Sequence, residues 1–388
     1  MVRELSLEAV EFLSGEAAGR ELEALATGGL EPLATLQRLR RRWGEDEAAW
    51  LFDQARLRRR AAAKFPAAAR MLFEAEALEQ ASSWPVARWR ARRFFAPWRR
   101  VADLGAGIGG DALALAEAGK RVLAVERDPV RAALLRYNAA ALGLAERLEV
   151  VVGDWRGLDL RLPAFADPAR RRRGRRSVRL GEMEPPLADL LALAERVPAL
   201  LVKLAPALDK AELPAGAAAG FVSLGGELKE ALLGLGGLAS PQPWAEVLPA
   251  GVGLRGPEAA APLAPPSGYL YEPDPAVIRA GLVGRLALEL GAALLAERVA
   301  YLTAPACRPS PLAGCWRILR HGPYRLKELR RWLRELDARS VNVKRRHSPV
   351  EPAELAAALP RGGAGPEATV FLTRLRGRPW MLLAVAAG

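Results

Sequence analysis

Four acidic residues in the middle of the chain each stand at the end of a short apolar run. The runs cover residues 101–104, 122–125, 148–152 and 164–166, and the acids are Asp103, Glu126, Asp154 and Asp167. Short apolar runs separated by helical stretches are typical of parallel strands. Because such strands end at the same edge of a sheet, where open α/β sheets bind ligands, we expect the four carboxylates to line one site.

A glycine-rich turn surrounds the first of these acids. Residues 103–111 read Asp-Leu-Gly-Ala-Gly-Ile-Gly-Gly-Asp, and their Gly-x-Gly-x-x-Gly pattern is by itself a weak signal for a dinucleotide. A carboxylate at Asp103 would repel a pyrophosphate but attract an ammonium or sulfonium group. The turn therefore favours S-adenosylmethionine over a nicotinamide cofactor, with Gly105, Gly107 and Gly109 in contact with it.

The other acids have separate predicted roles. Glu126 can accept both ribose hydroxyls, which suits either cofactor. Asp154 can accept the adenine amino group, and the Trp155 indole can either pack on the adenine face or belong to the core. Asp167 and the backbone of Pro168 can hold an acceptor amine and direct its lone pair at the methyl group.

Two basic clusters suggest a polyanionic partner, most often a nucleic acid. Six arginines fall within residues 170–176, directly after the acceptor segment, and residues 261–388 hold 19 basic against 10 acidic residues. Both clusters could contact phosphates. The alternatives are a solvated loop and a genome that prefers arginine. The predicted RNA contacts are Arg170, Arg171, Arg172, Lys344, Arg345 and Arg346.

The elements that position these residues divide the chain into four parts. Leucines at helical spacing predict a helical N-terminal domain, alternating strands and helices predict a doubly wound Rossmann-like α/β sheet, and a βαβαββ order predicts a small C-terminal α+β domain. A stretch rich in Pro, Gly and Ala predicts a linker with a connecting helix. In chain order these parts are 1–98 (helical), 99–251 (sheet), 252–310 (linker) and 311–388 (α+β).

Composition excludes several classes of protein. With 51% hydrophobic and 26% charged residues in 388, the chain can bury a core and is not disordered. Its two cysteines, Cys307 and Cys315, cannot make a disulfide scaffold or a zinc site, and no metal is expected. Both lie outside the predicted catalytic sheet, which disfavours pyrimidine C5 methylation. No apolar run is long enough to span a membrane, and the acidic N-terminus lacks a secretory signal, so a cytoplasmic protein is expected.

The central part resembles the class I S-adenosylmethionine-dependent methyltransferases. Residues 103–116 are similar to the first motif of the trimethylguanosine synthase group, which methylates guanine N2 in RNA caps. The whole chain resembles a prokaryotic family that joins such a domain to a C-terminal THUMP-like domain. The resemblance implies S-adenosylmethionine as cofactor and an RNA base amine, guanine N2 favoured, as acceptor. The segments that carry it are 77–81, 86–94, 167–171, 226–231, 272–281 and 344–346.

The acceptor segment departs from the pattern of amino-group methyltransferases. Ala169 and Arg170 stand where those enzymes have a second proline and an aromatic residue that stacks on the base. A stacking surface could come from Trp84, Trp89 or the planar guanidinium of Arg170. Three other functions stay open: a methyltransferase of a small molecule or protein, an RNA-binding protein that uses the fold as a scaffold, and a dehydrogenase.

Overall fold

The computed structural model describes most of the chain. Among the described residues, no helix is both long and apolar enough to cross a membrane. Within the same residues, no group of three or more His, Cys, Asp and Glu side chains is placed to hold a metal ion. The described residues are 5–27, 31–168, 171–172, 175–176 and 179–387.

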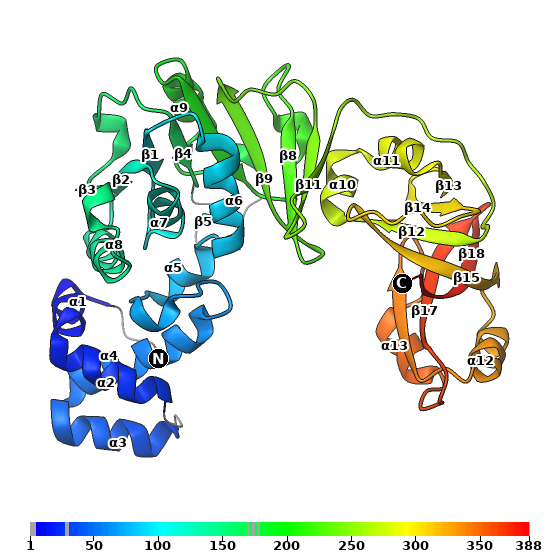
Figure 1. The fold of residues 1–388 in the computed structure, drawn as a ribbon, viewed down its shortest axis with the longest axis horizontal. Coiled ribbons are helices and arrows are strands. Elements are labelled where there is room, and N and C mark those ends of the chain that lie inside the picture. The colour runs from blue at the N-terminus through cyan, green and yellow to red at the C-terminus, as the bar shows by residue number, and fades with distance from the viewer. Residues whose placement is uncertain (1–4, 28–30, 169–170, 173–174, 177–178, 388) are drawn as a thin grey trace. The chain divides into compact units, whose positions relative to one another are not determined.

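The chain forms two compact units, whose helices and strands are labelled in Figure 1. The first unit consists of residues 1–213 and 232–240, and the second of residues 214–231 and 241–388. The strand β9 (Glu227–Gly236) begins in the second unit and ends in the first. The predicted helical part, 1–98, therefore lies wholly in the first unit and the predicted α+β part, 311–388, wholly in the second.

Helices make up most of residues 7–95, as the leucine periodicity predicts. The first helix begins at Leu7, where the Ser6 hydroxyl accepts a hydrogen bond from a backbone N–H of the first turn. Leu22 and Leu39 are fully buried, whereas Leu33 is 72% exposed, so part of the apolar stripe forms the packed face. The helices are α1 (Leu7–Ser14), α2 (Glu16–Thr27), α3 (Pro32–Trp43), α4 (Glu45–Ala61), α5 (Ala75–Gln80) and α6 (Trp84–Phe95).

The predicted helical part, 1–98, is interrupted between residues 68 and 80. A short 3-10 turn, η1 (Ala68–Arg70), and α5 are separated by an extended segment, 71–74. The side-chain amide of Gln54 bonds both backbone groups of Phe73, donating to its carbonyl at 2.6 Å and accepting from its N–H at 3.0 Å. In a helix, these backbone groups would bond to other backbone groups. Here the buried side chain of Gln54 bonds them instead, which explains why the segment is extended rather than helical.

Asn138 fixes the same extended segment to the sheet domain. Its side chain is fully buried, accepts from Leu72 N at 2.8 Å and donates to Leu72 O at 3.0 Å. The same amide donates to the carbonyl of Ile108, inside the glycine-rich turn, at 3.2 Å. One side chain therefore holds the N-terminal segment against the turn that carries the predicted cofactor contacts.

The large sheet has the predicted doubly wound α/β order. Its strands run β11-β10-β8-β9-β7-β4-β1-β2-β3, and β1 pairs in parallel with both β2 and β4. The strand order reverses between β1 and β4, which is where such sheets bind ligands. The strands are β1 (Arg100–Leu104), β2 (Arg121–Glu126), β3 (Leu148–Val152), β4 (Ala164–Ala166), β7 (Ala199–Leu204), β8 (Ala219–Leu224), β9, β10 (Trp244–Leu248) and β11 (Val252–Arg255).

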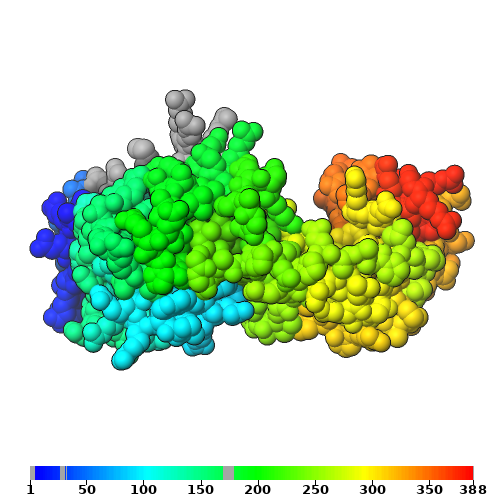
Figure 2. All heavy atoms as spheres, turned by 90° about the horizontal axis from the view of Figure 1, so that it is seen from above, coloured from blue at the N-terminus to red at the C-terminus, as the bar shows by residue number. Residues whose placement is uncertain are grey.

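Helices connect the parallel strands close to where the sequence predicts them. They are α7 (Gly110–Glu117), α8 (Pro129–Ala141) and α9 (Leu187–Ala194). Asp128 caps α8 by accepting from Val130 N at 2.8 Å. In the space-filling view the light-blue residues that precede the sheet lie beside the teal residues that follow them in the chain (Figure 2).

The second sheet differs from the prediction at its beginning. Residues 252–310, expected to be a linker with one helix, contain strands and two helices, because Leu270, Tyr271 and Tyr301 are fully buried core residues. Its strand order is β13-β14-β12-β15-β18-β17-β16. The elements are β12 (Tyr269–Pro273), α10 (Pro275–Ala280), α11 (Val283–Leu290), β13 (Ala293–Ala296), β14 (Val299–Ala304), β15 (Ala313–Pro323), α12 (Leu326–Glu335), β16 (Ser340–Arg345), α13 (Pro352–Ala358), β17 (Glu367–Leu375) and β18 (Arg378–Ala386).

The hydrogen bonds of Asn138 make a testable prediction about stability. Asn138→Ala leaves the buried backbone groups of Leu72 without their side-chain partner, so we expect a loss of about 2–4 kcal/mol of unfolding free energy. Urea denaturation measures the loss. Asn138→Asp is the control, because it keeps the acceptor for Leu72 N and removes the donor. A loss below about 0.5 kcal/mol for the alanine variant would contradict the anchoring role.

Candidate functional site

The glycine-rich turn leads from β1 into α7 with the backbone in the left-handed region. Gly109 precedes α7 with φ 98°, and a Cβ there would lie 2.3 Å from a methyl group of Leu135. Gly107 has φ 55°, and no other group of the described chain lies within 4 Å of where its Cβ would be. The turn thus packs closely on its protein side and leaves the backbone open at Gly107, as close approach by a ligand requires.

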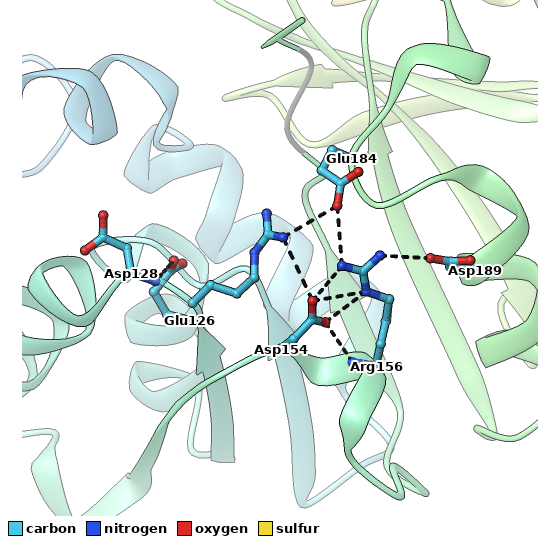
Figure 3. Close-up of polar contacts among 7 residues, drawn as sticks. Glu126, Asp128, Asp154, Arg156, Glu184 and Asp189 are labelled. Carbon is cyan, nitrogen blue, oxygen red and sulfur yellow. Dashed lines mark hydrogen bonds and ion pairs between the residues drawn. The ribbon is translucent and has the colours of Figure 1, made fainter.

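Glu126, at the end of β2, is bonded to this turn. One carboxylate oxygen accepts from Gly107 N at 2.7 Å. The other accepts from Asp128 N at 2.9 Å (Figure 3). The residue is 8% exposed. Each carboxylate oxygen has a further lone pair, so the two oxygens fit the predicted role of accepting from a pair of vicinal hydroxyls.

Asp154 follows β3 and lies in a network of charged side chains (Figure 3). Its carboxylate accepts from the guanidinium of Arg156 at 2.6 and 3.1 Å, and Arg156 also contacts Glu184 and Asp189. The bonds from Arg156 lower the pKa of Asp154 to about 2. Asp154 is therefore an ionised acceptor at every ordinary pH. The neighbouring Trp155 begins the 3-10 turn η3 (Trp155–Gly157) and is 6% exposed.

Asp103, at the end of β1, is the deepest of the four acids. It is 2% exposed, and among the described residues its Oδ2 has no hydrogen-bond partner. Burial raises the pKa of this carboxyl well above its usual range, repulsion from Asp111 and Asp167 adds to the increase, and Arg90 opposes it. A buried acceptor without a donor fits a cationic ligand group, such as the ammonium group of an amino acid.

Asp167, which follows β4, is paired with a lysine that sequence reasoning missed. Lys203 of β7 is 7% exposed and donates to Asp167 Oδ2 at 2.5 Å and to the Ser82 hydroxyl at 3.2 Å. Lys203 is the only charged residue in an otherwise apolar buried strand. This exception could have marked Lys203 in the sequence as a residue paired with an acid, because a buried charge needs a partner. Pro168, beside Asp167, is buried.

Arg90 of α6 is the second residue that sequence reasoning did not assign to the site. It is 1% exposed, donates to the Ser82 hydroxyl at 2.8 Å and forms an ion pair with Asp111 of α7. Its guanidinium also lies 4.5 Å from the ring centroid of Phe165 in β4. Arg90 lies in segment 86–94, which carries part of the family resemblance. The sequence alone gave no chemical role for a residue of that segment.

The C-terminal basic residues lie against acidic and aromatic side chains. Lys344 forms an ion pair with Glu272, lies 4.8 Å from the ring centroid of Trp316 and is half-buried. Arg346 lies 3.4 Å from the same carboxylate, and Arg345 pairs with Glu351. Their positive charge is therefore partly neutralised within the second unit.

The arginine segment is described only in part. Arg171–Arg172 (β5) and Arg175–Arg176 (β6) form a short antiparallel pair, whereas Ala169 and Arg170 lie outside the described residues. The candidate stacking residues Trp84 and Trp89 have aromatic neighbours in their own segment, Phe65 at 6.2 Å and Phe94 at 5.6 Å between ring centroids.

Comparisons with known proteins show the family to which the chain belongs. Residues 98–181 match a family model described as RNA cap guanine-N2 methyltransferase, and residues 313–386 match one described as THUMP domain-like. An uncharacterised S-adenosylmethionine-dependent methyltransferase of Mycobacterium tuberculosis, the same in strains H37Rv and CDC 1551, is 34% identical over 356 residues, 87% of this chain and 95% of the relative. A solved candidate methyltransferase of Porphyromonas gingivalis W83 has the same fold, with 22% identity, full coverage of both chains and a TM-score of 0.78.

The network around Asp154 makes a prediction about pH. Its lowered pKa adds stability that is present above the ordinary Asp range and is lost as the pH falls toward 2. The pair is largely exposed, so this stability is small, and titration is the better measurement. In Arg156→Ala we expect the carboxyl pKa of Asp154 to rise toward about 3.9.

NMR of carboxyl-labelled aspartate measures this pKa, with Asp154→Asn to assign the signal. Arg127→Ala is the matched control, because Arg127 lies 3.9 Å from Asp154 and should change the pKa much less. Equal changes of this pKa in the two arginine variants would show that the hydrogen bonds from Arg156 are not the cause of the lowered pKa of Asp154.

Proposed function

The chain belongs to a family of S-adenosylmethionine-dependent methyltransferases, and we propose that it methylates a base amine in RNA, with guanine N2 as the favoured atom. The observation that carries the proposal is Asp167, held by Lys203 at the end of β4 and preceding an arginine-rich hairpin. The similarity of residues 98–181 to the cap guanine-N2 methyltransferases supports the choice of atom.

The residues around the glycine-rich turn have the chemistry to hold the cofactor. Asp103 offers a buried acceptor to its ammonium group, Glu126 two oxygens to its ribose, and Asp154 an ionised acceptor to its adenine amine. Gly107 leaves the backbone open on the ligand side. When bound, the cofactor supplies a methyl group already activated by the sulfonium, so the protein's remaining task is to orient the acceptor.

Asp167 is the residue proposed to orient the acceptor amine. Lys203 bonds one carboxylate oxygen and thereby fixes the rotamer of the side chain, while the other oxygen can accept an N–H of the amine. The carbonyl of Asp167 lies 3.9 Å from where a Cβ of Gly105 would be, so it faces the cofactor turn and can accept a second N–H. Two acceptors for two N–H groups leave the nitrogen lone pair directed at the methyl group.

The RNA would be held by the arginine hairpin and by the THUMP-like unit. Residues 168–181 contain no acidic residue, so the charge of the hairpin is not offset by its own segment. The predicted contacts of Lys344, Arg345 and Arg346 with RNA stay part of the proposal, although Glu272 and Glu351 reduce their net charge. Arg170 could stack on the target base in place of the missing aromatic residue.

Methyl transfer from tritiated S-adenosylmethionine tests the function directly. With total RNA from cells that lack this gene, we expect label in RNA, and N2-methylguanosine after digestion to nucleosides. Asp167→Asn removes the acceptor charge and should lower the rate about 10²–10³-fold. Asp159→Asn is the matched control, since this exposed acid pairs only with Arg161 among the described contacts and should keep the wild-type rate. Label found only in protein or in small molecules would show that RNA is not the acceptor.

The salt dependence of RNA binding tests which residues bind the phosphates. Replacing Arg171, Arg172, Arg175 and Arg176 by Gln should weaken binding and reduce the slope of log K against log salt by roughly 0.7–0.9 for each phosphate that the variant no longer neutralises. The double variant of Lys344→Gln and Arg346→Gln should reduce the slope less, because Glu272 offsets both cations. A larger reduction of this slope in the double variant would show that the main RNA-binding surface belongs to the second unit.

A further inference from the structure

Three carboxyl groups and two cations meet behind the glycine-rich turn of the first unit. Arg90 forms an ion pair with Asp111, and Lys203 forms one with Asp167 at 2.5 Å. Asp103 is left as the third acid, with an Oδ2 that has no partner among the described residues. Since both cations are already paired, an ionised Asp103 would be a buried charge without a counter-ion of its own.

We propose that Asp103 is protonated in the free protein and loses this proton when a cofactor with an α-ammonium group binds. The O–H bond of the carboxyl breaks, its electron pair stays on the oxygen, and the proton passes to the solvent. The carboxylate that forms is then neutralised by the ammonium group. This step rests on the contact between Asp103 and the amino-acid end of the cofactor, which is part of the proposed function, and does not depend on the acceptor.

The surrounding charges favour this coupling. The acids that face Asp103 are Asp111 from α7 and Asp167 from the end of β4, and both repel a third negative charge. Arg90 from α6 attracts it but is shared with Asp111. Glu126, from the neighbouring β2, is committed to the backbone N–H groups of Gly107 and Asp128. Burial acts in the same direction as the repulsion and raises the pKa of Asp103.

Arg90 and Lys203 therefore act as positioning residues. Each neutralises one acid of the cluster, and together they leave a single carboxyl for the ligand. The ammonium group restores the balance of three negative and three positive charges. A ligand with the same adenosine moiety but no ammonium group would leave the proton on Asp103. The cluster thus distinguishes ligands by the charge of their amino-acid end.

Isothermal titration calorimetry of the full chain with S-adenosylhomocysteine measures the released proton. Titrations at about pH 6.5 keep the ligand's amino group protonated. Two buffers with different ionisation enthalpies then report the number of protons exchanged. We expect close to one proton released per ligand, and an affinity that rises up to about tenfold per pH unit until Asp103 ionises in the free protein. Methylthioadenosine, which has no amino-acid chain, should bind without proton release.

Variants assign the proton to Asp103. Asp103→Asn should abolish proton release and make the affinity independent of pH. Should that variant not fold, Asp111→Asn serves instead, because it frees Arg90 to pair with Asp103 and should reduce proton release in the folded protein. Glu117→Gln, which changes an exposed acid of α7, is the matched control and should behave as the wild type.

The outcomes separate this inference from the proposed function. Binding of S-adenosylhomocysteine without proton exchange, or equal release with methylthioadenosine, would overturn the inference and leave the RNA acceptor unaffected. Proton release with no label in RNA would support the inference and reject the RNA acceptor. No binding of S-adenosylhomocysteine at all would reject both the inference and the predicted cofactor contacts.

Discussion

The carboxyl groups of Asp103, Asp111 and Asp167 lie close together in the first unit, and Asp103 is buried, so an ionised Asp103 needs a cation beside it. Much of the first unit is arranged to meet this requirement. β7 supplies Lys203 to one acid, and α6 supplies Arg90 to another. Ser82 accepts hydrogen bonds from both cations and links the two pairs. The third acid, Asp103, has no such cation of its own, and this incomplete neutralisation is the reason why we propose that the cluster binds a ligand.

This requirement explains why the N-terminal helices belong to the site. Ser82 and Arg90 lie on the segment that precedes the sheet, and the extended residues 71–74 fix that segment through Gln54 and Asn138. Asn138 also bonds the carbonyl of Ile108 in the glycine-rich turn. A change in the helical part would therefore alter the electrostatics of the sheet. Segment 86–94, one of those that carry the family resemblance, contains Arg90 and so takes part in these contacts.

The sequence predicted the local features of the site and missed its long-range pairs. Acids at strand ends and glycines in a turn follow from periodicity and backbone geometry, which neighbouring residues determine. The pairing of Lys203 with Asp167, or of Arg90 with Asp111, depends on which strands and helices become neighbours in space. Residues 252–310 show the same limit. Their prolines and glycines indicate a linker locally, whereas Leu270 and Tyr301 become core residues only through packing with Phe371 of β17 and Leu382 of β18, far along the chain.

Net charge indicates a polyanionic partner only when the cations that are paired within the protein have been left out of the count. The last third of the chain has the largest basic excess, yet Lys344 and Arg346 share Glu272 and lie against Trp316 and Tyr301. Each cation that is paired in this way has fewer free hydrogen-bond donors for a phosphate. Residues 168–181 have six arginines within seven positions and no acid, and they follow the strand that ends in Asp167. A polyanion attracted to that segment would be brought next to Asp167, the proposed acceptor residue, so the position of the charge supports the proposal of an RNA substrate more strongly than the total charge does.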